Sequence, residues 1–162
     1  MLSEELKQVR AASALEAWDA SAIQEARLER GEPILHIDPA RIVAVCRFLK
    51  DQQQFVRLSA VTAIDWHPAE PRFEVVYQLH SLARQERLRL KCRVGGEQTE
   101  IDSVTGVWRA AGWYEREVFD LFGIGFRHHP DLKRIMMPAD WQGHPLRKDY
   151  PIHGYKYSYA EE

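Results

Sequence analysis

Four charged residues in one short segment give the clearest indication of chemistry in this sequence: Glu115, Arg116, Glu117 and Asp120. On a helix, Glu117 and Asp120 would be neighbours at i and i+3, and Arg116 would reach Asp120 at i+4. Two carboxylates held together can shift each other's pKa and carry out acid–base catalysis. The same cluster can instead form an ion-pair network that anchors the helix to the following segment or to a partner. No nucleophile or pocket motif accompanies it, so the structural interpretation is favoured.

Seven histidines raise the question of a metal site. His128 and His129 are adjacent and close to Asp131, and His144 and His153 follow later. Neighbouring side chains on an extended backbone point to opposite sides, and the sequence has no His-x-x-x-His pair that a helix would bring to one face. We therefore expect hydrogen-bonded loop histidines and no metal site.

The sequence also lacks the motifs that hold redox cofactors. An iron–sulfur cluster needs about four clustered thiolates, whereas Cys46 and Cys92 are far apart in apolar segments and are expected to be free thiols of the core. Gly95-Gly96 and Gly123-x-Gly125 lack the glycine spacing of a dinucleotide or phosphate loop. We expect this chain to bind no flavin, nicotinamide or cluster by itself.

The charged cluster lies in a segment predicted to be a helix from Trp113 to Phe122. Tyr114, Val118, Leu121 and Phe122 lie on one face at helical spacing. Gly123 then stands where a left-handed C-terminal cap places glycine. Prolines recur every six to eight residues from Pro130 to Pro151, so no long helix or central strand is expected beyond it.

Upstream, the hydrophobic pattern predicts several further elements. Helices are expected at residues 3–18, capped by Ser3, and at residues 39–51, which begin with Asp38-Pro39. Strands are expected at Ala22–Leu28, Ile34–Ile37, Phe55–Asp65, Phe73–His80 and Leu88–Val94, and a short helical turn at Ser103–Trp108. The fold class is α+β: an antiparallel or mixed sheet of four to five strands with helices on one face.

The domain organisation that follows has two parts. We expect an α+β domain at residues 1–127, with the helical N-terminus at about 3–18. The C-terminal arm, residues 128–162, is expected to be extended and rich in proline, aromatic and basic residues. Arginines mixed with aromatic residues are typical of protein interfaces. The arm is expected to dock to a partner, although folding back on its own domain is an equally open interpretation and the two are compatible.

Composition excludes several classes of protein. A net charge of −2 and 28% charged residues describe an ordinary soluble surface, and the acidic N-terminus lacks the basic, apolar pattern of a secretion signal. One strand places Arg87, Arg89, Lys91 and Arg93 on a single face. Such a row is usually a solvated sheet face relieved by neighbours such as Glu74. RNA binding is a weaker alternative, because no aromatic residues interleave for base stacking.

The sequence resembles a known family, the 30 kDa subunit (C subunit) of respiratory complex I, the NADH–quinone oxidoreductase. The segments that carry the resemblance are Trp113-Tyr114-Glu115-Arg116-Glu117, Asp120-Leu121-Phe122-Gly123-Ile124, His129-Pro130-Asp131-Leu132, Arg134-Ile135, Asp140-Trp141 and Gly143-His144-Pro145-Leu146-Arg147-Lys148-Asp149-Tyr150-Pro151. Weaker similarity, including Arg72–Tyr77, Ser103–Thr105 and Val107-Trp108, extends to about residue 40. One departure is Gly112, where the family usually has an asparagine that would cap the helix.

The resemblance implies a protein without catalytic residues or cofactors, in the peripheral arm of a proton-pumping enzyme on the cytoplasmic side of the membrane. It would pack against the D subunit, the large protein that helps to form the quinone site. Other members of the complex would hold FMN and the iron–sulfur clusters that connect NADH to quinone. The signature residues above would then serve assembly and the interface.

Three alternatives remain open at this point. Membrane-bound hydrogenases and complexes fed by ferredoxin or deazaflavin contain related subunits. A stand-alone acid–base or metal-dependent enzyme would use Glu117, Asp120 and the arm histidines. An RNA-binding α+β module would use the basic strand.

Overall fold

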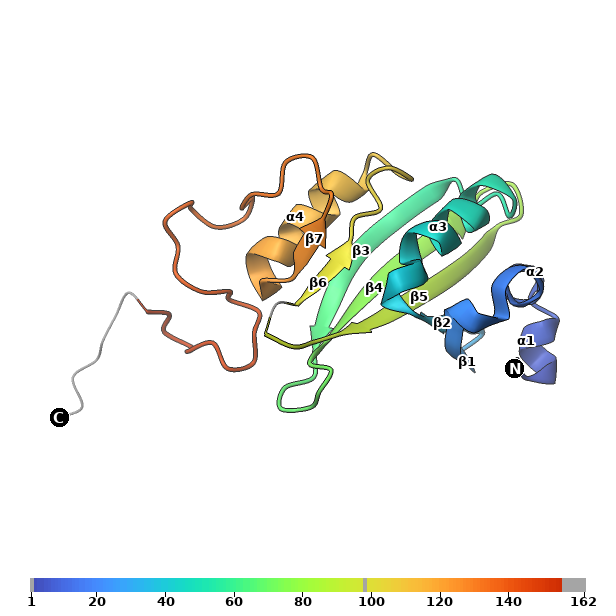
Figure 1. The fold of residues 1–162 in the computed structure, drawn as a ribbon, viewed down its shortest axis with the longest axis horizontal. Helices are drawn as coiled ribbons and strands as arrows, with labels where there is room; N and C mark the ends of the chain where they lie inside the picture. Colours follow the sequence, from blue (N-terminus) through green and yellow to red (C-terminus); the bar gives the residue numbers. More distant parts are fainter. Residues whose placement is uncertain (1, 98, 156–162) are drawn as a thin grey trace.

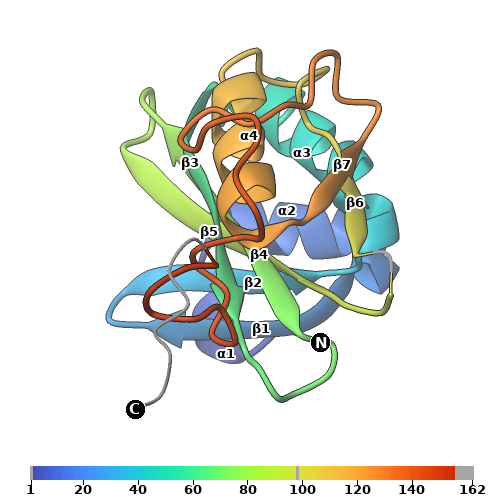
Figure 2. The ribbon, with the colours of Figure 1, turned by 90° about the vertical axis from the view of Figure 1, so that its left-hand side faces the viewer.

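A five-stranded mixed sheet with helices packed on one face forms the body of the protein (Figures 1 and 2). The computed structural model describes residues 2–97 and 99–155. The strand order is β1-β2-β5-β4-β3, and helices α3 and α4 lie on the same face of the sheet. The predicted α+β class, the number of strands and the one-sided placement of these helices are confirmed.

The centre of the sheet is the antiparallel pair of β4 (Phe73–Ser81) and β5 (Glu86–Val94), with β3 (Arg57–Asp65) on the outer side of β4. Alternation places Phe73, Val75, Tyr77 and Leu79 in the core. In β5, Leu88, Leu90, Cys92 and Val94 are buried in the same core. Cys46 and Cys92 are buried and free, as predicted.

The other edge of the sheet is a hairpin of β1 (Ile23–Glu29) and β2 (Glu32–Ile37). Its two-residue turn, Arg30-Gly31, has positive φ at both positions, 51° and 79°, which suits the twist of a hairpin. β2 pairs with β5 in parallel, so the sheet is mixed. This non-local pairing joins the hairpin to the central strands.

Helix α3 (Ile42–Asp51) follows the predicted cap at Asp38. The Asp38 carboxylate accepts the Ala40 N–H at 3.0 Å, and a 3₁₀ turn (η2, Pro39–Arg41) leads into the helix. Ile42, Val45, Cys46 and Leu49 are all buried, as their spacing predicted.

The single helix predicted at residues 3–18 is wrong: the segment forms α1 (Glu4–Lys7) and α2 (Arg10–Asp19), followed by a 3₁₀ turn, η1 (Ala20–Ala22). The chain breaks at Val9, which is extended (φ −79°, ψ 106°). Leu6 and Leu15 would lie on opposite sides of one straight helix, because nine steps of about 100° amount to half a turn beyond two full turns. The break lets both be buried. The predicted Ser3 cap is confirmed.

Helix α4 (Ala111–Phe122) begins two residues earlier than predicted. Gly112 is therefore inside the first turn and is not the N-cap, a position that Ala110 occupies. Gly123 ends the helix in the left-handed conformation (φ 74°), as predicted. A single turn at residues 104–108 precedes α4, with the Trp108 N–H donating to the Val104 carbonyl.

Two short strands that the sequence did not predict flank α4. β6 (Glu100–Asp102) and β7 (Gly125–Arg127) pair in parallel as a second sheet. Beyond β7, the described part of the C-terminal arm contains no helix or strand and extends past α4, at the opposite end of the molecule from α1 and α2 (Figure 1). Within the described ranges, no helix is long and apolar enough to cross a membrane.

Candidate functional site

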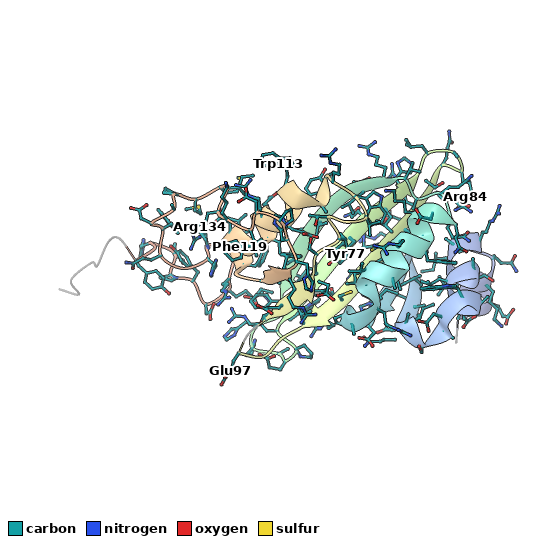
Figure 3. The ribbon with its side chains drawn as sticks, turned by 45° about the horizontal axis from the view of Figure 1, so that its top comes forward. Tyr77, Arg84, Glu97, Trp113, Phe119 and Arg134 are labelled. Atoms are coloured by element: carbon teal, nitrogen blue, oxygen red, sulfur yellow. The ribbon has the colours of Figure 1, made fainter. Side chains whose placement is uncertain are left out.

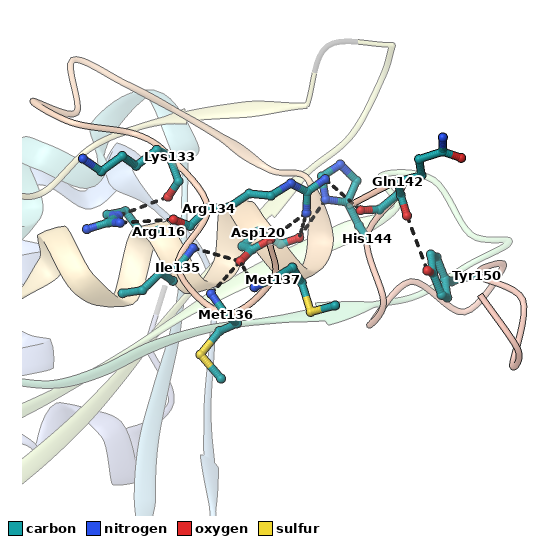
Figure 4. A network of polar contacts seen from close by, with 11 residues as sticks. Arg116, Asp120, Lys133, Arg134, Ile135, Met136, Met137, Gln142, His144 and Tyr150 are labelled. Atoms are coloured by element: carbon teal, nitrogen blue, oxygen red, sulfur yellow. Dashed lines mark hydrogen bonds and ion pairs between the residues drawn. The ribbon is translucent and has the colours of Figure 1, made fainter. Parts of the chain in front are cut away.

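The carboxylate of Asp120 fastens the C-terminal arm to α4 (Figure 4). Oδ2 accepts three successive backbone N–H groups, from Ile135, Met136 and Met137, at 2.9, 2.7 and 2.8 Å. Oδ1 accepts from Arg134 Nη1 at 2.6 Å. Asp120 is fully buried. Its charge is balanced by one cation and by three backbone N–H groups that belong to no helix or strand and therefore need another acceptor.

These contacts keep Asp120 ionised. Burial alone would raise its pKa, but the N–H groups of Met137 and Ile135 and the Arg134 guanidinium outweigh burial, and the net pKa lies below its ordinary value. A carboxylate that stays charged and fully hydrogen-bonded is a poor proton donor or acceptor. The geometry therefore favours the anchoring interpretation of this residue over acid–base catalysis.

Arg116 binds the same arm segment by a different route. Its guanidinium donates to the carbonyls of Lys133 and Arg134, at 3.1 Å each, and lies over the Trp113 ring at 5.2 Å. The predicted contact between Arg116 and Asp120 is wrong, because Arg134, fourteen residues further along, takes that position. The anticipated pair of carboxylates is also not formed, since Glu117 is exposed whereas Asp120 is buried.

The arm also caps the C-terminal end of α4. The last carbonyls of a helix have no partner within the helix. Here His144 Nδ1 donates to the Asp120 carbonyl at 2.8 Å, the Leu146 N–H to that of Leu121 at 3.0 Å, and Arg147 Nε to that of Phe122 at 2.6 Å. The arm thus replaces solvent at this helix end.

Gly123 allows this close approach. A Cβ at this position would lie 2.5 Å from Arg147 Nη2 and 2.6 Å from the His144 ring. A side chain there would also have to adopt positive φ. The glycine is therefore required both by the helix cap and by the arm that packs on it.

A third attachment joins the arm to the sheet. Arg72 lies between two carboxylates, with Nη2 at 2.7 Å from Asp65 and 2.6 Å from Asp149. Asp65 also accepts the Lys148 N–H at 2.8 Å. Arg147 lies over the Phe73 ring at 5.3 Å. Residues 144–149 are thereby held to the end of β3 and the start of β4.

Glu115, on the inner side of α4, is a buried carboxylate whose role the sequence did not reveal. Its two oxygens accept from the Ser103 hydroxyl at 2.6 Å and the Val104 N–H at 2.7 Å. His129 Nε2 is 3.9 Å away and donates to the Gly112 carbonyl, while its Nδ1 accepts the Asp131 N–H. Glu115 therefore joins α4 to the turn before it. Burial raises its pKa to about 7, against the opposing effect of the two hydrogen bonds.

This raised pKa predicts a pH-dependent stability. The folded chain binds the Glu115 proton more tightly than the unfolded chain, whose pKa is near 4.5. The resulting stabilisation is complete below pH 4.5 and lost as the pH rises through about 7. Between pH 5.5 and pH 8, wild type should lose about 2 kcal/mol more unfolding free energy than Glu115→Gln. Denaturant titrations at both pH values measure the difference, and equal losses in both proteins would contradict the assignment.

Of the remaining predicted site residues, Trp141 and Tyr150 lie in the outer part of the arm. Pro138, Asp140, Trp141, Gln142, Tyr150 and Tyr155 line a shallow hollow there. The Tyr150 and Tyr155 rings meet edge to face at 5.3 Å. Pro130, Pro145 and Pro151 lie in irregular segments, as prolines in an arm without regular structure should. Asp131 pairs with Lys133 at 2.9 Å on the surface.

The arm histidines do not converge. The His128 side chain is 85% exposed and the His129 side chain only 2%, so the two point apart, as predicted. Over residues 2–97 and 99–155, no three His, Cys, Asp or Glu side chains are grouped as metal ligands would be. Taken together, the contacts of Asp120, Arg116, His144, Arg147 and Arg72 are anchors that fix the arm to α4 and to the sheet.

Comparison with known sequences gives a consistent result. Residues 35–156 match the family described as respiratory-chain NADH dehydrogenase, 30 Kd subunit. The C subunit of the NADH-quinone oxidoreductase of Geotalea uraniireducens is 50% identical over 135 residues, which are 83% of this chain and 82% of the relative. That of Geobacter sulfurreducens is 48% identical over 136 residues, 83% and 84% of the two chains.

Two solved structures are similar as well. The trypsin-resistant fragment (1-134) of Nqo5 has a TM-score of 0.66 and 30% identity, covering 74% of this chain and 97% of the fragment. A chain of the membrane-bound sulfane sulfur reductase, an archaeal respiratory membrane complex, has a TM-score of 0.78 over 90% of this chain and 86% of its own. At 24% identity the second likeness shows the fold alone.

Proposed function

The chain belongs to the 30 kDa subunit family of respiratory-chain NADH dehydrogenases, as a C subunit of an NADH-quinone oxidoreductase, and on that premise we propose that it is a cofactor-free structural subunit that docks to the large quinone-site subunit. It would lie in the peripheral arm of the complex, on the cytoplasmic side of the membrane, and support electron transfer from NADH to quinone without catalytic residues of its own. The α4–arm surface, formed by Trp113, Arg116, Ile135 and Met136, would be the docking surface.

The absence of a bound cofactor is the first part of this proposal. Cys46 and Cys92 are buried in the core, and burial raises the pKa of both thiols, so neither is poised to bind a metal as thiolate. We expect the purified chain to show no flavin or cluster absorbance and no stoichiometric zinc. Visible spectroscopy and elemental analysis measure this, and either signal at one equivalent would contradict the proposal.

The observation that carries the docking surface is the exposure of large apolar side chains on a rigid support. Trp113 is 63% exposed and Met136 62% exposed. Trp113 points outward from α4 (Figure 3). Arg116 lies over its ring, and Asp120 holds the backbone of Met136 by accepting its N–H. Tryptophan, methionine and arginine are enriched in interface cores.

Burial on a partner would explain this exposure. Each such side chain left in water forgoes about 1.5–3 kcal/mol of burial free energy. Arg116 is already oriented by two backbone carbonyls, so little further ordering is needed when a partner binds. A preformed patch of this kind suits permanent assembly into a complex.

The test is the double variant Trp113→Ala/Met136→Ala. In a pull-down with the large quinone-site subunit, we expect binding to fall by at least about tenfold, as hot-spot truncations of more than 1 kcal/mol each predict. The far-UV circular dichroism spectrum should be unchanged, because both side chains are exposed.

Trp66→Ala provides a matched control. Trp66 is also an exposed tryptophan, 42% accessible, but it lies after β3 and contacts Arg93. Its loss should leave binding to the large quinone-site subunit unchanged. Equal binding by wild type and the double variant would mean that the docking surface lies elsewhere.

A further inference from the structure

Three basic side chains stand side by side on the sheet face turned away from α3 and α4. Arg57 of β3 is in register with His80 of β4, and His80 is in register with Arg87 of β5. Their neighbours Leu58, Leu79 and Leu88 belong to the core, so alternation places the three on the opposite face. We call them the basic row.

The basic row lacks internal compensation. Within the described residues, no hydrogen bond or ion pair reaches the side chains of Arg57, His80 or Arg87. Two other basic side chains of the same strand face are paired: Arg89 with Glu32 at 2.7 Å and Lys91 with Glu74 at 3.0 Å. Like charges placed close together on a sheet face destabilise it. The row has no carboxylate of the described chain paired with it.

The surface is hollowed at the same place. One hollow is lined by Arg57, Gln78, His80, Arg87 and Arg89, together with Glu32, Ser59, Leu79 and Leu88. A second continues from His80 and Arg87 to Leu82, Gln85 and the hairpin turn at Gly31–Pro33. The two share His80, Arg87 and Glu32. The basic row thus lines a continuous groove across β3, β4 and β5.

We propose that this groove binds an acidic segment of another protein subunit, whose carboxylates pair with Arg57, His80 and Arg87. The row spans two strand spacings, about 10 Å, which suits carboxylates placed along an extended chain. Gln78 can donate to and accept from a peptide backbone between them. For the native partner, this inference rests on the proposed function as a subunit of a complex.

Other anionic ligands fit the groove less well. Single-stranded nucleic acid is bound through aromatic stacking, and the groove-lining residues include no aromatic ring other than that of His80. A single phosphate would be too small to engage basic groups spread over about 10 Å.

The first test uses a fluorescent eight-residue glutamate peptide and the full chain. Arg57→Glu/Arg87→Glu should weaken peptide binding by about tenfold or more, because two favourable pairs become repulsive. Arg47→Glu/Arg109→Glu, which reverses two exposed arginines outside the groove, serves as a control with the same change in net charge and should alter binding less than about twofold. An equal loss of peptide affinity in both variants would mean that only the net charge of the protein matters, and it would overturn the proposal.

Two comparison ligands decide the class of partner. A single-stranded RNA oligonucleotide and anionic phospholipid vesicles are titrated alongside the peptide. We expect the charge reversal to affect these no more than the control does. Tighter binding of RNA or vesicles than of peptide, lost in the double variant, would overturn the assignment to a protein segment.

Thermal unfolding distinguishes a binding role of the basic row from a role in stabilising the fold. Arg87→Gln should weaken peptide binding and leave the melting temperature within about 1 °C, because Arg87 forms no ion pair within the described chain and its charge is two strands from that of Arg57. A lower melting temperature would show that Arg87 supports its own fold, contrary to the proposal.

The last test uses the assembled complex and separates this inference from the proposed function. A photo-crosslinking residue at Gln78 should capture an Asp- or Glu-rich segment of another subunit, identified by mass spectrometry. A neutral or basic segment, or no crosslink in a complex that has assembled, would overturn the groove alone. Loss of binding to the large quinone-site subunit by Trp113→Ala/Met136→Ala remains a separate result, because that surface lies on α4 and the arm.

Discussion

Replacing Asp120 by alanine is expected to lower the amount of assembled complex several-fold while each assembled complex keeps its normal turnover. Asp120 accepts three backbone N–H groups and one guanidinium from the arm. Removing one member of a buried, fully hydrogen-bonded charge pair typically costs about 3–5 kcal/mol if its partners stay buried.

Movement of the arm should make the loss of unfolding free energy smaller than this. Residues 133–137 can move into water and hydrate their free N–H groups, so the isolated chain should lose only about 1–3 kcal/mol of unfolding free energy. That movement would release Met136 from α4 and so displace it from the proposed docking surface. Assembly is therefore expected to suffer more than folding.

The measurements are the abundance of the complex in purified membranes and NADH–quinone turnover per assembled complex. Glu117→Ala is the matched control, because Glu117 is an exposed carboxylate of the same helix and should be neutral. Arg116→Ala should fall between the two, since it removes two hydrogen bonds from a half-buried side chain. Full assembly of the Asp120 variant with lost turnover would restore the acid–base interpretation.

Local patterns were sufficient to predict much of this fold. The alternation of β4 and β5, the spacing of Ile42, Val45 and Leu49 in α3, and Gly123 after α4 are each decided by neighbours within a few residues. The parallel contact of β2 with β5 joins strands that are far apart in the chain, which no local pattern encodes. β6 and β7, with three residues each, are too short for a period to show.

In the candidate site, too, the local helical spacing could be predicted, whereas contacts with distant segments could not. The helical spacing brings Arg116 and Asp120 to one side of α4, but their partners come from the arm. Arg116 donates to the carbonyls of Lys133 and Arg134. Asp120 accepts from the Arg134 guanidinium and from three backbone N–H groups. The burial of Glu115 depends on the turn at Ser103 and Val104. The sequence did contain one indication that Glu115 is buried. Glu115 lies three residues before Val118 and next to Tyr114, so its position is compatible with the apolar face of the helix.

Truncation after Arg127 is expected to leave the sheet folded and to abolish docking to the large quinone-site subunit. The five strands and α3 make their contacts without the arm, so far-UV circular dichroism should keep its sheet signal. The chain should nevertheless lose about 2–3 kcal/mol of stability, because α4 loses the donors to its last carbonyls and Arg147 no longer covers Phe73. Asp120 itself is uncovered and hydrated, which limits the loss. Complete unfolding would instead show that the arm belongs to the core.

A second truncation, after Pro138, distinguishes the two halves of the arm. It keeps Arg134 and the N–H groups of residues 135–137 that bind Asp120, so Met136 stays anchored to α4. It removes His144, Arg147 and the aromatic hollow at Trp141 and Tyr150. Docking in a pull-down should therefore survive with a loss of less than about tenfold, since no central residue of the patch is removed. Docking lost to the same extent as after Arg127 would move the interface to residues 139–155. Docking retained by both truncations would place it on the sheet, where the basic row offers charge to a partner.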